Sequence, residues 1–423
     1  MLQPFSTDSP PEKGRLWTRV AIPLGSPVEM GRLLAPAPGF IWLDSAVEGP
    51  SSVSLLTAWP DRLLEGALAQ DWTAVEEALH EGTAAGHSGG LFGWVGYDGQ
   101  FVLGLYPHAL LYDHAQGEWF ECGDFTQKLS SLPSLPTESA ALSLPRLPFE
   151  PLVARENFLA QVRRAQEYIV AGDIYQVNIS QPWRAEWPVG TPFFPFYERL
   201  RRVSPAPHAA CVNLGETTLL SASPELFLKL SGRTIATHPI KGTRPRFPTD
   251  PARDDASARE LLASDKERAE LLMITDLERN DLGQVCEFGS VKVPDLWRVE
   301  SFAQVYHLVS TVTGTLRPGI SHAAAFRACF PGGSITGAPK KRASEIIAEL
   351  EPYPRGPYTG AVGYFGFDGE SQWNIVIRTA VQKGAEITFH AGSGIVADSI
   401  PEKEWEETLH KASGILAAWS AED

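Results

Sequence analysis

Helix-like and strand-like segments in the C-terminal part of the chain do not alternate one for one, and this order restricts the possible folds. Apolar residues at helical spacing predict helices at residues 155–171, 257–277, 323–330, 339–350 and 402–418. Strand-like runs lie between them in groups, at residues 174–179, 219–221, 226–230, 233–237, 359–367, 373–381 and 387–391. A doubly wound sheet needs strands and helices in alternation, so the pattern predicts an α+β fold.

A Ser- and Pro-rich stretch at residues 131–151 has no apolar period and is typical of a linker. The chain has 423 residues, more than one hydrophobic core usually organises. We therefore predict an N-terminal region at 1–130 and a C-terminal domain at 152–420, joined by this linker.

The charge balance narrows the range of partners. The chain has 36 Lys and Arg residues against 51 Asp and Glu residues, a net charge of -15. This balance argues against a nucleic-acid or anionic-membrane partner, although a local pocket for a small anion is compatible with it. The four cysteines have no metal-ligand spacing, and no apolar run resembles a signal peptide or a membrane span. We expect a cytoplasmic protein without membrane contact.

Two pairs of glutamates are candidates for a metal site. Glu267 and Glu270 are three residues apart on one predicted helix, and Glu404 and Glu407 have the same spacing on the last one. Residues at this spacing share a helix face. Oxygen ligands without nearby His or Cys favour Mg²⁺ if the two faces meet. Two ordinary solvated acidic faces are the alternative, in which Lys411 is only a salt-bridge partner of Glu407.

Lys241 is a candidate nucleophile. It follows a strand-like run, and Gly242 behind it leaves room for a ligand to approach. A lysine becomes nucleophilic when burial or a neighbouring cation lowers its pKa, and Arg244 and Arg246 are candidate cations. A solvated lysine in a basic loop is the alternative.

Other segments carry weaker signals. Residues 332–340 form a glycine-rich turn before a helix, which suits an anion but lacks the Lys-Ser/Thr of a nucleotide-binding loop. The GSGIVA sequence at 392–397 matches GxGxxA, but no second strand completes a dinucleotide fold. Arg378 lies within a predicted strand and suits a carboxylate ligand, whereas His307 among apolar residues is more typical of a core histidine.

Taken in order, these segments resemble the chorismate-utilising enzymes, which include the large subunits of anthranilate synthase and aminodeoxychorismate synthase and the isochorismate and salicylate synthases. The resemblance rests on residues 172–178, 223–225, 238–246, 276–281, 332–340 and 404–411 together with Arg378. It implies an anthranilate synthase component I-like fold, with β-sheets in a sandwich flanked by helices. The domain at 152–420 is then the chorismate-binding catalytic domain, and region 1–130 fits more loosely.

The resemblance also implies site roles. Mg²⁺ is bound by Glu270 and Glu407, supported by Glu267 and Glu404, and holds the ring carboxylate of chorismate. Further roles fall on residues that contact the substrate or its leaving groups. They are Lys411 and the turn containing Gly392 and Gly394 for the ring carboxylate, Arg378 and Tyr358 for the enolpyruvyl carboxylate, Thr336 and Gly242 for the pocket wall, Glu225 as general acid, and His307 at the position associated with pyruvate elimination.

Two positions separate the branches of the family. The isochorismate-type enzymes have a lysine base where this chain has Gln176, and anthranilate synthases usually have a small residue where it has Lys241. The resemblance is therefore nearest to aminodeoxychorismate synthase, a transferase on the route to 4-aminobenzoate and folate. There a lysine attacks C2 of chorismate, ammonia enters at C4, and the lysine leaves.

The resemblance implies a separate glutamine amidotransferase subunit as ammonia donor, because the chain has no cysteine nucleophile in a glycine-rich elbow. Leu43 and Ser45 lie in a stretch similar to the tryptophan pocket of relatives, and binding of tryptophan is left open. Anthranilate synthase component I is the alternative function. A non-catalytic chorismate- or amino-acid-binding regulator is a third, which has no need of Glu225 and Lys241.

Overall fold

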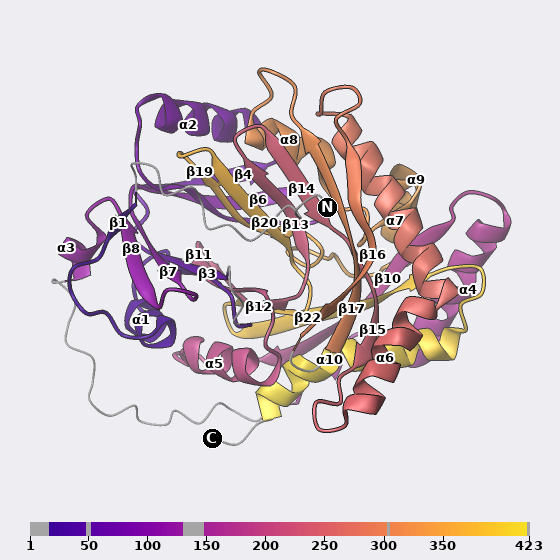
Figure 1. The fold of residues 1–423 in the computed structure, drawn as a ribbon. Helices are drawn as coiled ribbons and strands as arrows, with labels where there is room; N and C mark the ends of the chain where they lie inside the picture. Colours follow the sequence, from indigo (N-terminus) through magenta and orange to yellow (C-terminus); the bar gives the residue numbers. More distant parts are fainter. Residues whose placement is uncertain (1–16, 48–51, 130–147, 303–304, 421–423) are drawn as a thin grey trace.

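The computed structural model describes residues 17–47, 52–129, 148–302 and 305–420. In this part of the chain two antiparallel β-sheets face each other and helices lie around them, which confirms the α+β prediction (Figure 1). Within the same residues, no helix is long and apolar enough to cross a bilayer.

The larger sheet has 12 strands among the described residues. In spatial order they are β1 (Thr18–Arg19), β8 (Glu118–Cys122), β7 (Ala109–Asp113), β3 (Val53–Thr57), β2 (Ile41–Asp44), β11 (His208–Leu214), β12 (Thr217–Ser223), β21 (Thr379–Lys383), β22 (Glu386–Ile395), β10 (Gln176–Glu186) and β18 (Gly337–Ala338), with β9 (Glu150–Pro151) paired to β10.

The smaller sheet has 10 strands in the described part of the chain. Their order is β15 (Ile240–Pro245), β17 (Val305–Thr315), β14 (Thr234–His238), β13 (Leu226–Ser231), β20 (Glu370–Ile375), β19 (Ala361–Gly366), β5 (Gly90–Val95), β6 (Gln100–Tyr106) and β4 (Arg62–Ala67), with β16 (Lys292–Ser301) paired to β17.

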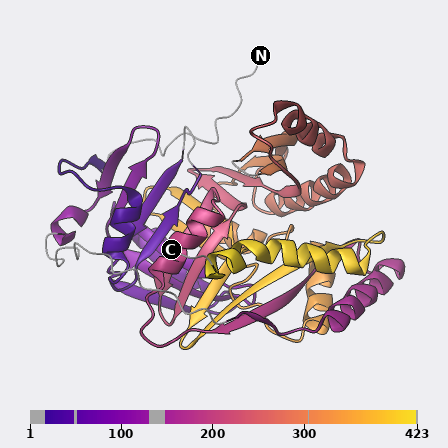
Figure 2. The same cartoon turned by 90° about the horizontal axis from the view of Figure 1, so that it is seen from below.

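The helices pack on the sheets and on one another. Their bounds are α1 (Pro27–Leu34), α2 (Trp72–Ala84), α3 (Phe125–Leu129), α4 (Arg155–Val170), α5 (Phe194–Val203), α6 (Pro251–Ala263), α7 (Asp265–Gly283), α8 (His322–Cys329), α9 (Lys340–Leu350) and α10 (Pro401–Ser420). Helices α6 and α7 lie on β15 and β17, while α10 runs along β22 beside α4 and α5 (Figure 2). The two helices that carry the glutamate pairs therefore cover different sheets.

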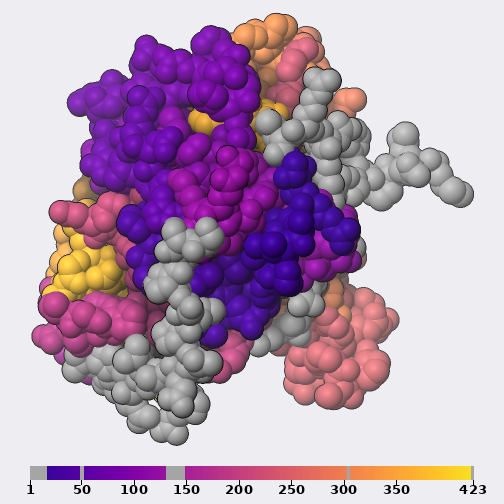
Figure 3. All heavy atoms as spheres, turned by 90° about the vertical axis from the view of Figure 1, so that its left-hand side faces the viewer, coloured from indigo at the N-terminus to yellow at the C-terminus, as the bar shows by residue number. Residues whose placement is uncertain are grey.

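Each sheet combines strands from before and after residues 131–151. Residues 130–147 of the predicted linker lie outside the described residues. The predicted boundary between two domains therefore stays a prediction. It does not coincide with a boundary between the two sheets. N-terminal residues cover one face of the molecule (Figure 3).

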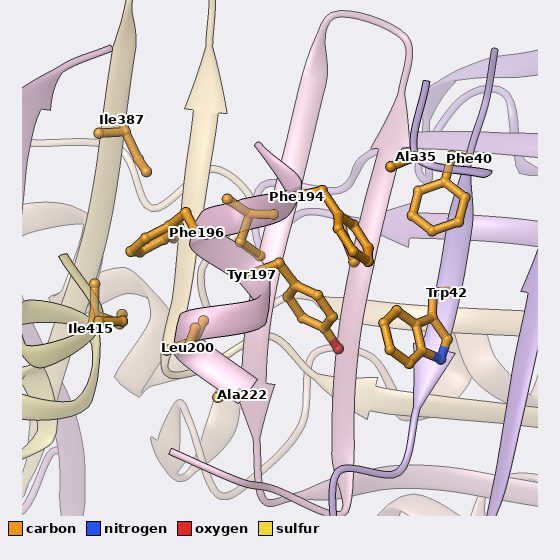
Figure 4. Close-up of a cluster of buried hydrophobic side chains, with 14 of the residues drawn as sticks. Ala35, Phe40, Trp42, Phe194, Phe196, Tyr197, Leu200, Ala222, Ile387 and Ile415 are labelled. Carbon is orange, nitrogen blue, oxygen red and sulfur yellow. The ribbon is translucent and has the colours of Figure 1, made fainter. Parts of the chain in front are cut away.

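Alternate side chains along a strand of the larger sheet point to opposite faces, and each face is covered by its own hydrophobic cluster. Ile41 and Leu43 of β2 join the cluster between the two sheets, whereas Trp42 joins the cluster beneath the helices. There Trp42 contacts Phe194 and Tyr197 of α5, with the Trp42 and Phe194 ring centroids 6.1 Å apart (Figure 4). Each such buried side chain contributes roughly 1.5–3 kcal/mol of transfer free energy. The period of two is what gives one strand two buried faces.

Two sequence predictions about elements are wrong in detail. The helix predicted at 257–277 is two helices that meet at Ser264, whose backbone is extended and whose side chain accepts a hydrogen bond from Glu267 N (3.4 Å). A serine in this conformation caps a new helix, so the earlier one ends. The strand predicted at 373–381 is divided into β20 and β21, which lie in different sheets.

Candidate active site

The nucleophile predicted at Lys241 lies where the two sheets meet. It is on β15, at one end of the smaller sheet, and faces β22 near the end of the larger sheet. A Cβ built on Gly394 of β22 would be 3.6 Å from Lys241 Nζ and 2.8 Å from Gln176 Nε2. The Gln176 side chain is buried, and its Oε1 has no hydrogen-bond partner among the described residues. Lysine and glutamine therefore face the same glycine from opposite sheets.

Of the two candidate cations beside Lys241, Arg246 is paired with an acid elsewhere, and the role of Arg244 stays a prediction. Arg246 forms an ion pair with Asp254 (2.9 Å), on α6. The charged groups that interact with Lys241 are acids on three separate segments, namely Glu225, Glu270 and Glu407. Lys241 therefore lies on a strand and its charge acts on three carboxyls, unlike a solvated lysine in a loop.

The predicted turn containing Gly392 and Gly394 is part of strand β22 and pairs with β10. Helix α10 is fastened to it by two contacts: Lys411 Nζ donates to the Gly392 carbonyl (2.9 Å), and the Ser393 hydroxyl donates to Glu404. Lys411 also pairs with Glu407 at 2.6 Å. A strand without side chains at two alternate positions leaves its backbone open on that face.

The glutamates of α7 lie beside the Lys241–Gly242 segment, since a Cβ built on Gly242 would be 2.9 Å from Glu267 Oε2. Burial raises the pKa of the Glu270 carboxyl, with added repulsion from Glu267 and Glu407 and opposition from Lys241. Partial burial acts against ionisation of Glu407, but the Lys411 ammonium outweighs it and lowers the pKa of that carboxyl. The two predicted pairs thus interact electrostatically, as expected if their helix faces meet.

The glutamates have the donor chemistry of a metal site but are not yet arranged around one point. Among the described residues, no group of three or more His, Cys, Asp or Glu side chains is already close enough to hold a metal ion. The available donors are carboxylate oxygens that repel one another, which matches the ligand chemistry of Mg²⁺. Mg²⁺ binding therefore remains a proposal, with Glu270 and Glu407 as the residues that would hold it.

Glu225 lies between β12 and β13, in a segment that fixes its backbone. Its N–H donates to Ser223 Oγ (3.3 Å) and its carbonyl accepts from Ile375 N (3.0 Å). Burial raises the pKa of its carboxyl, and the positive charges of Lys241, Lys411 and Arg378 oppose this shift. A buried carboxyl with a raised pKa among cations suits a general acid.

Arg378 is not in the middle of a strand, contrary to the sequence prediction. It lies between β20 and β21, where the chain passes from the smaller to the larger sheet, and has a left-handed backbone with φ 49°. Its carbonyl accepts a hydrogen bond from Ala222 N (3.1 Å). Burial lowers the pKa of its guanidinium, although the Glu225 carboxylate opposes this. A strained backbone at a buried cation is a feature of functional sites.

His307 lies opposite Thr243 on β17, next to the Lys241–Gly242 segment. Its Nδ1 is hydrogen-bonded to Thr243 Oγ1 at 3.0 Å. Burial, aided by the Arg378 charge, lowers the pKa of the imidazole to about 4. The ring is therefore neutral at pH 7.

Tyr358 and Thr336 are both buried near β10 and β22. Tyr358 stacks on His390 with ring centroids 5.0 Å apart, and burial raises the pKa of its phenol to about 12. A Cβ on Gly392 would lie 2.9 Å from its hydroxyl oxygen. The Thr336 hydroxyl donates to the Gly332 carbonyl (2.9 Å), so it orders the glycine-rich segment.

Arg355 has a structural role that the sequence analysis missed. Its buried guanidinium pairs with Glu351 (2.7 Å) and donates to the carbonyls of Asn178 (2.7 Å) and Ile335 (3.1 Å). It thus joins β10 to the glycine-rich segment. No periodicity or motif distinguishes this arginine from a surface one.

Leu43 and Ser45, named for a possible tryptophan pocket, are buried at the end of β2. Leu43 packs between the sheets, and Ser45 Oγ donates to the Val47 carbonyl (3.1 Å). Asp44 between them binds Arg201 at 2.6 Å. Tryptophan binding stays a prediction.

Comparisons with known proteins agree with this geometry. Residues 60–417 match the family described as chorismate binding enzyme. An anthranilate synthase component 1 of Haloarcula marismortui is 49% identical over 270 residues, which cover 64% of this chain and 55% of that protein. An aminodeoxychorismate synthase component 1 of Klebsiella aerogenes is 42% identical over 322 residues, 74% of this chain and 70% of that one.

A solved structure has the same fold. Anthranilate synthase component I from Streptococcus pneumoniae matches with a TM-score of 0.76 and 29% identity, over 87% of this chain and 93% of that chain. The family match spans most of the described residues, including every element that builds the site. The chain therefore belongs to the chorismate-binding enzyme family.

Proposed function

We propose that this chain is the synthase component of an aminodeoxychorismate synthase, which aminates chorismate at C4 to give 4-amino-4-deoxychorismate. The observation that carries the proposal is the position of Lys241. Its Nζ lies close to the open backbone of β22 at Gly394, among Glu225, Glu270 and Glu407. A primary amine inside the site supports covalent catalysis, whereas a solvated lysine would have no such surroundings.

In the proposed reaction the Lys241 amine forms a bond to C2 while the ring double bond shifts and the C4–O bond breaks. Glu225 gives its proton to the departing oxygen, which leaves as water. Ammonia then forms a bond to C4, the C2–nitrogen bond breaks with its electron pair returning to Lys241, and the new C4 ammonium passes its surplus proton to the Glu225 carboxylate, which restores the acid. The enolpyruvyl ether is retained throughout. Splitting one displacement into two steps is the advantage of a covalent intermediate.

The remaining residues bind and orient the substrate in this proposal. Arg378 and Tyr358 hold the enolpyruvyl carboxylate, and Lys411 with the Gly392–Gly394 backbone receives the ring carboxylate. Bound Mg²⁺ would hold that ring carboxylate and neutralise Glu270 and Glu407. Ammonia is supplied by a separate glutamine amidotransferase subunit, a partner consistent with the name component 1 carried by the relatives.

Anthranilate synthase component I is a second candidate, and the names of the similar proteins support it. Several of the most similar proteins carry that name, at identities of 46% and 49%. His307, neutral at pH 7 and next to the Lys241 segment, is at the position associated with pyruvate elimination. A non-catalytic regulator is less well supported, because a binder has no use for a buried acid beside a lysine.

Product analysis decides between these functions. The protein is incubated with chorismate, Mg²⁺ and ammonium chloride, and the products are separated by mass and treated with an aminodeoxychorismate lyase. A product that keeps the enolpyruvyl group and yields 4-aminobenzoate supports the proposal. Fluorescent anthranilate with released pyruvate places the chain in the tryptophan branch instead.

Lys241→Ala tests the covalent step. We expect loss of at least about 10²-fold in formation of the 4-amino product, since the nucleophile is removed. The control is Lys383→Ala, at an exposed lysine on β21 that pairs with Glu216 at 3.8 Å. Full activity of Lys241→Ala would refute the mechanism.

A further inference from the structure

One face of β22 carries a side chain that the proposed reaction does not use. Side chains alternate between the two faces of a strand, so His390, Gly392 and Gly394 share one face of β22. A Cβ built on Gly394 would be 3.6 Å from Lys241 Nζ. A Cβ built on Gly392 would be 2.9 Å from the Tyr358 hydroxyl oxygen. The amine and the phenol hydroxyl therefore lie beside neighbouring positions of this face, which are about 7 Å apart along the strand.

The third position of this face, His390, supports the Tyr358 ring. The imidazole and the phenol are stacked, with ring centroids 5.0 Å apart and an interplanar angle of 15°. Both side chains are buried, with His390 9% and Tyr358 5% exposed. Burial, aided by the Arg355 charge, lowers the pKa of the imidazole to about 3, so the ring is neutral at pH 7. The contact is therefore a stack of two neutral rings.

The sheet holds the His390 ring more firmly than it holds the Tyr358 ring. Tyr358 lies outside the strands, and its N–H donates to the Arg355 carbonyl (3.1 Å). His390 lies within β22, which pairs with residues 177–186 of β10. Its Nδ1 also forms a long hydrogen bond with Ser180 Oγ of β10 (3.5 Å). The sheet therefore fixes the His390 ring, which in turn limits the positions that the Tyr358 hydroxyl can take.

We propose that His390 is a positioning residue, whose ring holds the Tyr358 hydroxyl beside Gly392, one position along the strand face from Lys241. The enolpyruvyl carboxylate is then bound at a set distance from the amine that attacks C2. This carboxylate is bound both before and during the reaction, so His390 acts on substrate affinity and not on the chemical step. The inference rests on the carboxylate-binding role of Tyr358 in the proposed function. It holds for either amination product, because both reactions start from the same substrate.

The competing explanation is that the stack only stabilises the fold, and three variants separate the two. His390→Ala removes the ring, whereas His390→Phe keeps a stacking ring but lacks the nitrogen that is bonded to Ser180. His108→Ala is the matched control. His108 is also buried, 3% exposed, with its ring centroid 5.3 Å from that of Phe125. It precedes β7, and five other strands lie between β7 and β22 in the larger sheet.

The first readout is the steady-state kinetics of chorismate consumption at saturating Mg²⁺ and ammonium. His390→Ala should raise KM for chorismate about fivefold, the scale of one aromatic contact, and leave kcat within about twofold of the parent. His390→Phe should restore the parent KM, and His108→Ala should keep it while losing thermal stability. An unchanged KM in His390→Ala, an equal rise in His108→Ala, or no recovery in His390→Phe overturns the proposal.

The second readout tests whether His390 acts through the Tyr358 hydroxyl. Tyr358→Phe removes only this hydroxyl and should also raise KM for chorismate. In a double-mutant cycle, His390→Ala should have little further effect in the Tyr358→Phe background, because the group that it positions is gone. Additive increases in KM would show that His390 does not act through this hydroxyl, and the proposal would then be wrong.

The third readout is calorimetric binding of chorismate with Mg²⁺ and without ammonium, which does not depend on turnover. If Tyr358→Phe binds chorismate as tightly as the parent, the role of Tyr358 in the proposed function fails, and this inference fails with it. If Tyr358→Phe binds more weakly but His390→Ala binds like the parent, only this inference fails. Weaker binding by both, with parent-like binding by His390→Phe, supports it. Should His390→Ala not fold, His390→Leu is used, because leucine fills the space without a stacking ring.

Discussion

Gly242→Ala tests how β15, which carries Lys241, packs against α7, which carries the predicted metal ligands Glu267 and Glu270. Gly242 has φ 75°, and a Cβ built there would lie 2.8 Å from Leu261 Cδ1 and 2.9 Å from Glu267 Oε2. Alanine at this position therefore meets two penalties: a left-handed backbone, and a contact that pushes Glu267 and α6 away. Gly232→Ala is a matched control, because Gly232 has φ 54° and nothing within 4 Å of a built Cβ.

The magnitudes follow from these two penalties. A left-handed backbone costs a non-glycine residue about 1–2 kcal/mol, and overpacking adds about 1–3 kcal/mol. We expect Gly232→Ala to lose only the first amount and Gly242→Ala to lose about 2–5 kcal/mol in total. With an unfolding entropy of about 2.1 cal/mol/K per residue over 423 residues, 1 kcal/mol corresponds to roughly 1 °C in Tm. The expected Tm decreases are therefore about 1–2 °C and about 2–6 °C.

The assay pairs thermal unfolding with a Mg²⁺ titration of chorismate consumption. Displacement of Glu267 should weaken the apparent Mg²⁺ affinity of Gly242→Ala by about tenfold, as loss of a supporting ligand does, and leave that of Gly232→Ala unchanged. Equal Tm losses in the two variants would refute the contact with Leu261 and Glu267. An unchanged Mg²⁺ titration in Gly242→Ala would refute the role of Glu267.

Three further predictions test the site and its support. Glu270→Gln should weaken the apparent Mg²⁺ affinity roughly tenfold or more, and an identical titration would remove Glu270 from the metal set. Arg355→Met leaves the buried Glu351 carboxylate unpaired and should lower the free energy of unfolding by about 3–5 kcal/mol, measured in denaturant; a parent-like midpoint would contradict this. Burial lowers the pKa of His390 from 6.5 to about 3, so the unfolded state binds the extra proton. Stability should therefore fall below about pH 6.5 by up to about 1.4 kcal/mol per pH unit. His390→Phe should flatten that slope, which an unchanged pH profile would contradict.

Motifs on single elements were the most predictable part of the molecule. The helix at residues 155–171 is found as α4, and Gly172 follows it with φ 83°. The spacing of Glu404 and Glu407 correctly placed both on one helix. These features depend on local geometry, because capping and helical spacing act over a few residues.

The sequence predictions failed where the local structure depends on contacts between segments that are distant in sequence. The run at 373–381 is continuously strand-like in sequence, but Arg378 turns the chain from one sheet to the other. The glycines at 392 and 394 look like a turn, yet pairing with β10 makes them part of a strand. Arg355 shows no pattern, because its partners at 178 and 335 are far away in sequence.

The sequence by itself determined the α+β class and the family resemblance, and it supplied the residue types of the proposed site: a lysine, an acid and four glutamates. Local spacing and side-chain chemistry are sufficient for those inferences. Only the tertiary structure decided that Lys241 Nζ lies near Gly394 of the other sheet, and that its charge acts on the carboxyls of Glu225, Glu270 and Glu407, which come from three separate segments. These properties are set by burial and by the distances between charged groups. Both depend on residues from several segments, so no single segment of the sequence reveals them.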